Sequence, residues 1–532
     1  MKNQIVNLLS QNIEVLTSEE ISQLIEIPPK PEMGDFAFPC FRLAKSYHKA
    51  PPMIAQDLKE SIGDQAFLSE IKVIGGYLNF YVDKAQYAQQ IIDKYKNTTD
   101  YGCSDQGKDK TICIDYSSPN VAKNFHVGHL RTTIIGNSLY KIFSKLGYKV
   151  VRINHLGDWG TQFGKLIVAY KKWGSREAVE EKGIEELMDI YVKFHEEAEK
   201  DDSLNDEARA WFLKMEQGNE EALEIWQWFR DISLKEFMRV YNILGMEFDS
   251  FAGESFYRDK TAGVIKRLTD DGLLKESQGA MIVPLDEYDM PPCIVAKKDG
   301  SSIYATRDLA AILYRKATYN FDRCLYVTGL EQKLHFAQVF KVIELMGNDY
   351  AKNLVHIPYG LVSLKSGKIS SRKGNVIFAE DLLRESINKT TSIIEEKNPD
   401  IPDKEEVAKQ VGIGAIIFND LYNQRIKDVI FDWNKLLNFD GETGPYVQYT
   451  YARASSVLRK IGEVPDTIDY TLLTDEASIG LLKEIERYPQ VIKDAAERYE
   501  PSVIARYSID LAHAFNKFRS EERRVGKECF GW

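Results

Sequence analysis

Two histidines separated by a Val-Gly pair stand out, because the chain contains only 8 histidines. His126 and His129 lie in SSPNVAKNFHVGHLRTTIIGN, between a strand-like run and a helix-like run, with Lys123 just upstream. Imidazoles and a lysine can donate hydrogen bonds to a phosphoryl oxygen as charge builds in a transition state. Gly128 would let a flat ring or a phosphate approach the backbone. Capping of a helix start is the alternative interpretation of the two rings.

A second segment, SLKSGKISSRKGNV, is basic throughout and spans residues 363–376. It contains no acidic residue, and its glycines would let it bend around a ligand. Such a loop can close over a polyphosphate, since phosphoryl transfer depends mainly on positioning and charge stabilisation. A solvated surface loop is the alternative. Together the two segments predict ATP bound between them and attacked by an external nucleophile. The basic residues of the second segment are Lys365, Lys368, Arg372 and Lys373.

The elements around these segments predict a parallel sheet. TICIDY and YKVVRIN are strand-like, and apolar residues between Leu130 and Leu146 keep helical spacing. Strand, helix and strand at this length form a βαβ unit, and ligands bind where its first strand ends. No GxGxxG or GxxxxGK[ST] motif is present at this loop, so neither a dinucleotide fold fingerprint nor a P-loop is predicted.

Changes of pattern along the chain predict three domains and a multidomain α/β fold. Residues 1–100 predict a small α+β domain, and residues 396–532 an all-helical domain. Residues 101–395 predict a Rossmann-like parallel-sheet domain with a helical insertion at about 171–255. The insertion is strongly acidic, which predicts a like-charged face that would repel phosphate.

The composition limits the class of protein. Six cysteines are scattered without CxxC spacing, which argues against zinc and against a disulfide framework and favours the reducing cytoplasm. No apolar run reaches the roughly 18–20 residues of a membrane span. The net charge of −11 does not exclude a nucleic-acid partner, because binding follows local patches.

Several motifs together resemble a known family. HVGH resembles the HIGH signature of class I aminoacyl-tRNA synthetases, and KISSR resembles their KMSKS signature. NHLGDWGTQFG, YATRDLAA, EQKLHF and GPYVQYTYAR resemble blocks of arginyl-tRNA synthetases in the same order, and PEMGDFAF resembles their added N-terminal domain. The resemblance covers nearly the whole chain. It implies that arginine and ATP form arginyl-adenylate and diphosphate, and that the arginyl group then moves to the terminal ribose of tRNA(Arg), releasing AMP.

The resemblance also implies residue roles. Carboxylates suit the guanidinium fork of arginine. Tyr304 and Asp308 would share a face if a helix begins near residue 303, although an ordinary helix start is the alternative. The implied arginine site consists of Asp115, Asn120, His126, Tyr304, Asp308 and Gln332. The implied ATP site consists of His126, Gly128, His129, Lys368, Ser370, Arg372 and Lys373.

Two departures from the family pattern affect the expectations. Ser371 stands at the fourth position of KMSKS, where lysine is usual, so we expect Lys123 and Lys368 to share the catalytic role with His126 and His129. The chain ends in RSEERRVGKECFGW, which lacks an apolar period and does not resemble the family. A truncated or chimeric helical domain with impaired folding or tRNA affinity is therefore expected.

The remaining expectations concern partners. The resemblance implies that the N-terminal domain contacts the outer corner of tRNA and the helical domain contacts the anticodon. Tyr446, Tyr449 and Arg453 are weak tRNA candidates, because the tyrosines of this helix-spaced stretch are more typical of a core. Mg²⁺ is expected with ATP, without a metal-binding residue in the protein, and the chain is expected to be a monomer.

Rival interpretations come from two classes of protein. A cysteinyl enzyme would need zinc ligands, and a glutamyl enzyme would need a cationic pocket, where Asp115 and Asp308 have the wrong sign. A non-catalytic tRNA-binding paralogue would not need an ATP clamp.

Overall fold

The computed structural model describes residues 1–297, 304–364, 367–368, 378–397, 399–462 and 467–529. The chain forms two compact units. Unit 1 contains residues 1–101, 453–488 and 510–532, and unit 2 contains residues 102–452 and 489–509. Across the described residues, no helix combines the length and apolar character needed to cross a membrane.

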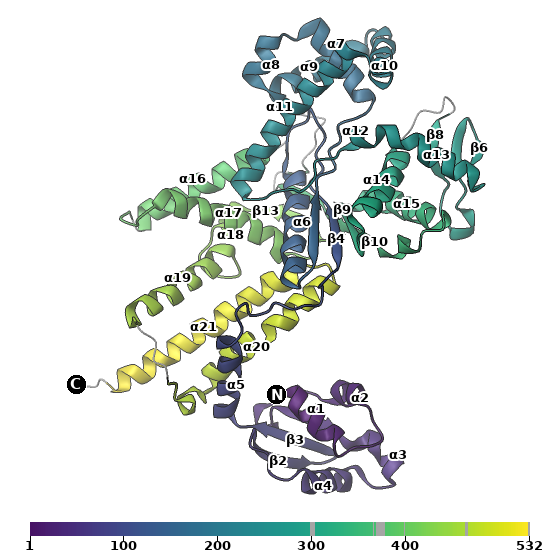
Figure 1. Ribbon diagram of the computed structural model, residues 1–532. Coiled ribbons are helices and arrows are strands. Elements are labelled where there is room, and N and C mark those ends of the chain that lie inside the picture. Colours follow the sequence, from purple (N-terminus) through teal and green to yellow (C-terminus); the bar gives the residue numbers. More distant parts are fainter. Residues whose placement is uncertain (298–303, 365–366, 369–377, 398, 463–466, 530–532) are drawn as a thin grey trace. The chain divides into compact units, whose positions relative to one another are not determined.

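The N-terminal part of unit 1 is an antiparallel sheet covered by helices (Figure 1). Its strands β1 (Phe36–Pro39), β2 (Leu68–Ile74) and β3 (Tyr77–Val82) lie in the order β1-β3-β2. Strand β1 follows a segment rich in turn residues, IPPKPEMGD. Phe36 faces Phe80 in the register, and these paired apolar residues stabilise a strand that local composition disfavours. The helices of this part are α1 (Lys2–Ser10), α2 (Ser18–Leu24), α3 (Ala44–Tyr47), α4 (Pro51–Ile62) and α5 (Lys84–Lys96).

The central sheet of unit 2 is parallel, as predicted. Strands β4 (Thr111–Asp115), β5 (Lys149–Ile153), β9 (Arg323–Gly329) and β10 (Leu354–Tyr359) lie in the order β10-β9-β4-β5. From β4 the chain moves through α6 (Val127–Lys145) to β5, whereas from β9 it moves through α15 (Lys333–Leu345) in the other direction. Strand order therefore reverses between β4 and β9, and ligands of open α/β sheets bind at such a point.

Smaller elements flank this sheet. Strands β6 (Lys275–Ser277), β7 (Ala280–Val283) and β8 (Cys293–Lys297) form an antiparallel sheet beside α13 (Thr261–Asp270) and α14 (Tyr304–Tyr319). Strand β11 (Val362–Leu364) pairs with β12 (Gly367–Lys368) and, in parallel, with β13 (Val429–Phe431). Strand β13 interrupts a region whose sequence predicted helices alone, because its pairing partner lies about 65 residues upstream and leaves no local signal.

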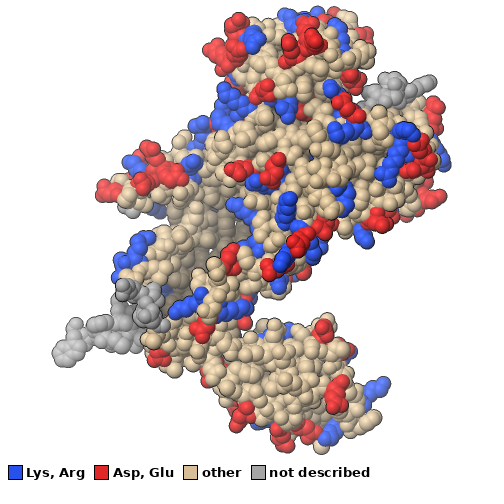
Figure 2. Space-filling model, in the orientation of Figure 1, with Lys and Arg blue, Asp and Glu red and all other residues tan. Residues whose placement is uncertain are grey.

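The expected helical insertion is present, and ion pairs offset part of its acidic charge. Its cluster of buried apolar residues includes Phe194 and Trp211. Acidic residues outnumber basic ones in its sequence, and Figure 2 shows both signs of charge on the visible face. Ion pairs join Lys172 to Glu207 at 3.0 Å and Arg176 to Glu180 at 2.8 Å. The helices are α7 (Thr161–Trp173), α8 (Arg176–Lys182), α9 (Ile184–Ala198), α10 (Ser203–Glu216) and α11 (Glu220–Leu244).

The C-terminal region is mainly helical, which completes the predicted multidomain α/β fold. Helix α21 continues into the sequence RSEERRVGKEC as far as Cys529. The helices are α16 (Ala379–Lys397), α17 (Lys404–Tyr422), α18 (Trp433–Leu436), α19 (Gly444–Ile461), α20 (Glu476–Glu497) and α21 (Ser502–Cys529).

Candidate active site

A cavity of about 630 Å³ lies where the strand order reverses. Its walls come from the ends of β4, β9 and β10 and from the starts of α6, α14 and α15. A larger depression of about 810 Å³, beside α11 and residues 251–258, contains none of the predicted site residues. The predicted residues that line the 630 Å³ cavity are Asp115, Asn120, His126, Gly128, His129, Tyr304, Asp308 and Gln332.

The two histidines cap helix α6 and line the cavity at the same time. The Nδ1 atom of His126 accepts a hydrogen bond from the backbone N–H of Gly128 at 3.1 Å. The Nδ1 atom of His129 accepts one from the backbone N–H of His126 at 3.3 Å, and the two rings stack 3.8 Å apart. A neutral imidazole that accepts at Nδ1 carries its proton on Nε2. Each ring is therefore a fixed Nε2–H donor, so the capping and phosphate-binding interpretations are compatible.

Burial keeps both imidazoles neutral. It lowers the pKa of His126, and the nearby charge of Lys123 lowers it further. The pKa of His129 lies well below its ordinary value because of burial, with smaller contributions from His126 and Lys123. Neutral rings hold the Nε2–H tautomer at physiological pH. A side chain at position 128 would approach the His126 ring to 2.9 Å, which explains the glycine between them.

The loop between β4 and α6 is held in an unusual backbone conformation. Ser117, Ser118 and Ala122 have φ angles of 70°, 45° and 59°, in the left-handed region. This region is unfavourable for residues with a side chain, and it persists where surrounding contacts hold it. The hydroxyl of Ser118 donates to Asp115 at 2.9 Å, and the backbone N–H of Ala122 donates to Ser233 at 2.9 Å.

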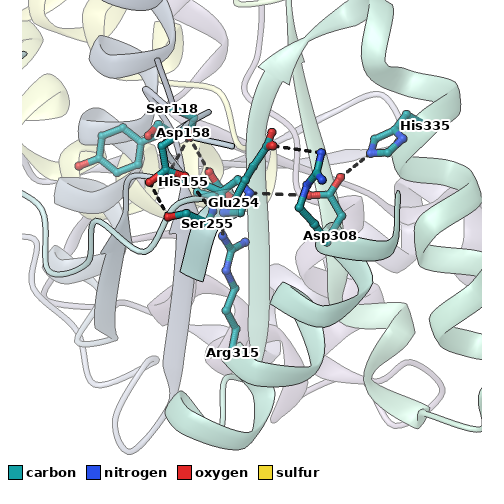
Figure 3. A network of polar contacts seen from close by, with 11 residues as sticks. Ser118, His155, Asp158, Glu254, Ser255, Asp308, Arg315 and His335 are labelled. Carbon is teal, nitrogen blue, oxygen red and sulfur yellow. Dashed lines mark hydrogen bonds and ion pairs between the residues drawn. The ribbon is translucent and has the colours of Figure 1, made fainter. Parts of the chain in front are cut away.

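Acidic side chains gather on another wall of the cavity, which we call the arginine side and define by Glu254, Asp308 and Asp115. Figure 3 labels Glu254 and Asp308 in the network of polar contacts at this wall. Asp308 accepts a hydrogen bond from His335 Nε2 at 2.6 Å. Burial alone would raise the pKa of Asp308, but His335, together with His155 and Arg315, outweighs it and lowers the pKa. Asp308 is therefore an ionised carboxylate inside the cavity.

Glu254 differs from Asp308 in its ionisation. Its carboxylate lies 3.2 Å from the guanidinium of Arg307, and only 12% of its side chain is exposed. Burial raises its pKa to about 8, against the opposing effect of Arg307. One of its carboxyl oxygens has no hydrogen-bond partner among the described residues. Glu254 can therefore receive a cationic ligand by losing a proton.

Asp115 lies at the predicted place but is already paired. Its carboxylate is 2.8 Å from the guanidinium of Arg315, whose side chain is 1% exposed. Burial lowers the pKa of Arg315. Asp115, nearby tyrosines and Cys324 outweigh burial and raise the pKa of Arg315 well above the ordinary value. His155 Nδ1 lies 3.3 Å from the same guanidinium. Asp115 is thus paired with a buried cation, and Asp308 supplies the accessible negative charge.

The other predicted ligands vary in position. Asn120 forms a parallel bridge with Gly157 at the cavity edge. Tyr304 begins α14, one helical turn before Asp308, and is 58% exposed. The exposed Lys123 does not line the 630 Å³ cavity but a small separate one with Tyr191. Lys368 ends β12, and its side chain lies outside the described residues, as do Ser370, Arg372 and Lys373.

The helical spacing of the tRNA candidates of α19 favoured a position in a core, but the candidates do not form one. Tyr449 is 52% exposed, whereas Tyr446 is half-buried. In unit 1, Arg453 lies 3.5 Å from the side-chain oxygen of Asn516. The exposed tyrosine agrees better with the stacking interpretation than with the core interpretation.

Four residues of the arginine side escaped sequence reasoning: Glu254, Arg315, His155 and His335. His335 had a signal, since it follows Gln332 by three residues in EQKLHF and so lies near it at the start of a helix. His155 belongs to the NHLGDWGTQFG block, whereas Glu254 and Arg315 come from segments without a signal. Arg315 contacts Asp115 and is not among the residues that line the cavity. Among the described residues, no group of three or more His, Cys, Asp or Glu side chains is arranged to hold a metal ion.

Comparisons with known proteins agree with this geometry. The sequence matches "tRNA synthetases class I (R), catalytic domain" over residues 90–433. It also matches "Arginyl tRNA synthetase N terminal domain" over residues 3–82 and "DALR anticodon binding domain" over residues 447–528.

Curated relatives and a solved structure extend the match to nearly the whole chain. The chain is 57% identical to an arginine–tRNA ligase of Clostridioides difficile, over 97% of this chain and 91% of that protein. It is 56% identical to one of Clostridium beijerinckii, over 97% and 92%. The arginyl-tRNA synthetase structure of Thermus thermophilus aligns with a TM-score of 0.77 and 25% identity, over 93% of this chain and 87% of that one. The chain therefore belongs to the arginyl-tRNA synthetase family of class I synthetases.

Proposed function

We propose that the chain is an ATP-dependent, AMP-forming arginine–tRNA ligase. The observation that carries this function is a single cavity that combines fixed imidazole donors at a helix start with an acidic wall. The donors suit the phosphates of ATP, and the acidic wall suits a guanidinium. The family match and the curated relatives support the same activity.

In the first step, an oxygen of the arginine carboxylate attacks the α-phosphorus of ATP. A phosphorus–oxygen bond to arginine forms, the bond to the β-phosphate breaks, and diphosphate leaves. The attacking carboxylate is already ionised, so no general base is needed. His126 and His129 would donate Nε2–H bonds to phosphoryl oxygens whose charge grows in the transition state, and the N–H groups at the start of α6 add a positive dipole.

On the arginine side, Asp308 and Glu254 would bind the substrate guanidinium, with Tyr304 at the same helix start as Asp308. A guanidinium presents a fixed fork of donors, which two carboxyl groups can accept together. Asn120 and the paired carboxylate of Asp115 lie by the loop that leads to the histidines, where the α-amino end of arginine would lie. Gln332 completes this wall from the segment between β9 and α15.

The second step transfers the arginyl group to the terminal ribose of tRNA(Arg) and releases AMP. Lys368, Ser370, Arg372 and Lys373 would contact ATP from the basic segment, and Lys123 would assist from beside the histidines. Mg²⁺ would accompany the ATP phosphates. We further propose domain bounds of 1–100, 101–395 and 396–532, a monomeric state and a cytoplasmic location. In this scheme the N-terminal domain contacts the outer corner of tRNA, and Tyr446, Tyr449 and Arg453 contact tRNA from the helical region.

Charging of labelled arginine onto bulk tRNA tests the proposed function, with lysine, glutamate and cysteine as parallel substrates. We expect charging with arginine alone, because an acidic wall rejects glutamate and the forked acceptors suit a guanidinium better than an ammonium. Asp322→Asn is a matched control, because Asp322 precedes β9 at the N-terminal ends of the strands, and within the described parts of the chain its carboxylate accepts only the Thr111 backbone N–H. Equal charging with glutamate, or none with any amino acid, would contradict the proposal.

A further inference from the structure

Arg131 is a buried cation that the proposed reaction does not use directly. It lies on α6, two residues after His129, and its side chain is 1% exposed. Its nearest charge is the carboxylate of Asp420 on α17, 3.6 Å from Nε. This distance leaves Nε and one oxygen of Asp420 without a hydrogen-bond partner among the described residues. The ion pair is therefore too loose to explain the burial of the guanidinium.

The terminal nitrogens of Arg131 bind the backbone instead. One donates to the carbonyl oxygen of Arg425 at 2.9 Å and to that of Lys427 at 2.8 Å. The other lies 3.4 Å from the carbonyl oxygen of Leu361. A planar guanidinium can hold several acceptors in a fixed relation, which a lysine ammonium cannot reproduce. The three carbonyls belong to two chain segments that are also joined by strand pairing and by hydrogen bonds from the backbone N–H groups of Gly360 and Leu361.

One of these two segments continues into the basic segment, and the other continues into the strand that pairs with it. Leu361 immediately precedes β11, whose chain continues into the basic segment at residues 365–377. Lys427 lies just before β13, which pairs with β11, and the Val429 N–H donates to the Leu361 carbonyl at 2.9 Å. The chain that leaves the basic segment returns to the same helix start, because the Ala379 N–H donates to the Phe125 carbonyl at 2.9 Å.

Arg425 keeps its carbonyl in place through its own side chain. Its Nε donates to the carbonyl of Tyr499 at 2.9 Å, and a terminal nitrogen donates to that of Pro358 at 2.5 Å. Its carbonyl also accepts the Gly360 N–H at 2.9 Å. The Arg425 carbonyl is therefore held by contacts of its own, one of them from Gly360 at the cavity wall.

We propose that Arg131 is a positioning residue for ATP, which fixes the histidine turn of α6 relative to the strand pair β11–β13. The proposal rests on the proposed function, because it assigns the nucleotide to His126 and His129. Among the described residues, the hydrogen bonds of Arg131 go to backbone carbonyls, so it acts through the elements it joins, and it also lines the cavity. Loss of this junction would shift the histidine turn against the strand pair β11–β13 while the arginine side keeps its own contacts.

The first test is the conservative variant Arg131→Lys in the charging assay, with ATP and arginine varied separately. Misplacement of reacting groups by an ångström can cost about a hundredfold in rate, so we expect kcat/KM for ATP to fall by about tenfold or more. We expect less than about a twofold change in KM for arginine, since the Lys side chain leaves the arginine side unchanged. Arg267→Lys is the matched control, because Arg267 also donates to a backbone carbonyl, that of Met346 at 2.8 Å, away from the cavity.

Equal increases in KM for ATP and in KM for arginine, accompanied by a lower melting temperature, would show a merely structural role and overturn the proposal. Wild-type enzyme that charges no arginine would instead contradict the proposed function. A second measurement needs no variant: hydrogen exchange of the wild-type chain with and without ATP. We expect ATP to protect amides of residues 429–431, which do not line the cavity, together with those at the start of α6. Protection at α6 without any at residues 429–431 would also overturn the proposal.

Discussion

Two buried arginine–aspartate pairs border the same cavity but differ in geometry. Arg315 and Asp115 approach to 2.8 Å, and Asp115 also accepts a bond from Ser118. Arg131 and Asp420 are 3.6 Å apart, and Arg131 directs its terminal nitrogens to backbone carbonyls. The first pair adjusts the charge of a cavity wall, whereas the second joins chain segments. A buried arginine can therefore serve either electrostatics or architecture, and its hydrogen-bond acceptors show which.

The difference also appears in the ionisation of the acids. Asp420 is fully buried with a distant cation, and burial raises its pKa to about 6 despite Arg131. On the arginine side, the neighbours of Asp308 overcome burial and lower its pKa. Burial thus raises the pKa of the architectural acid, whereas the pKa of the acid on the substrate wall is lowered.

Asp308→Asn should produce the largest effect of the variants considered. The amide keeps the shape but removes the charge that faces the substrate guanidinium and His335. Loss of one partner of a buried charge pair costs about 2–5 kcal/mol, so we expect kcat/KM for arginine to fall by about a thousandfold. Steady-state charging kinetics measure it. A fall of less than about tenfold would remove Asp308 from the guanidinium site.

Asp420→Asn should change the pH dependence of stability. An acid whose folded pKa is raised stabilises the fold fully below its unfolded pKa and loses that contribution as pH rises through the folded value. For Asp420 this window lies between about pH 4 and pH 6, and it corresponds to at most about 3 kcal/mol. Urea unfolding from pH 4 to 7 should show that the variant lacks this decline. Parallel curves for the two proteins would contradict the raised pKa.

His126→Asn separates capping from catalysis. Asparagine is a good N-cap and can still accept the Gly128 N–H, but it lacks the imidazole Nε2–H. Removal of one transition-state donor costs about a hundredfold in kcat, and we expect this loss with an unchanged melting temperature. His126→Ala removes the cap as well, which should lower stability by about 1 kcal/mol. An active His126→Asn variant would assign the histidine to capping alone.

Glu254→Gln should have the smallest effect, confined to pH dependence. A cationic ligand favours ionised Glu254, so arginine affinity should rise with pH up to the pKa of about 8, by at most about tenfold per unit. The low pKa of Asp308 adds nothing in this window. Calorimetric titration of arginine from pH 6.5 to 8.5 should show a pH-dependent affinity and proton release in the wild type only. A pH-dependent affinity that persists in the variant would assign the titration to another group.

The sequence predicted the parallel sheet and the HVGH helix because each has a local signal: β-branched strands, helical apolar spacing and a rare pair of histidines. The resemblance to a family also predicted that Asp115 and Asp308 lie in the same site. The sequence did not predict that Arg315 pairs with Asp115, since the two residues are 200 positions apart. Strand β13 and the carbonyl contacts of Arg131 could not be predicted either. Both depend on backbone groups, which are the same for every residue type.

The acidic insertion shows a local detail that composition does not give. Spacing of three or four residues along its helices brings Lys and Arg beside Asp and Glu, as in Arg176 and Glu180. These pairs offset part of the negative charge of a segment that remains rich in Asp and Glu.

The central claim, that one cavity binds arginine at its acidic wall and ATP at the histidine turn, is tested most directly by crossed kinetics. Charging rates would be measured for the wild type, Asp308→Asn and His126→Asn, with arginine and ATP varied in turn. The claim predicts that Asp308→Asn raises KM for arginine and leaves KM for ATP unchanged, whereas His126→Asn lowers kcat and leaves KM for arginine unchanged. Equal changes in KM for arginine and in KM for ATP, in both variants, would contradict the claim.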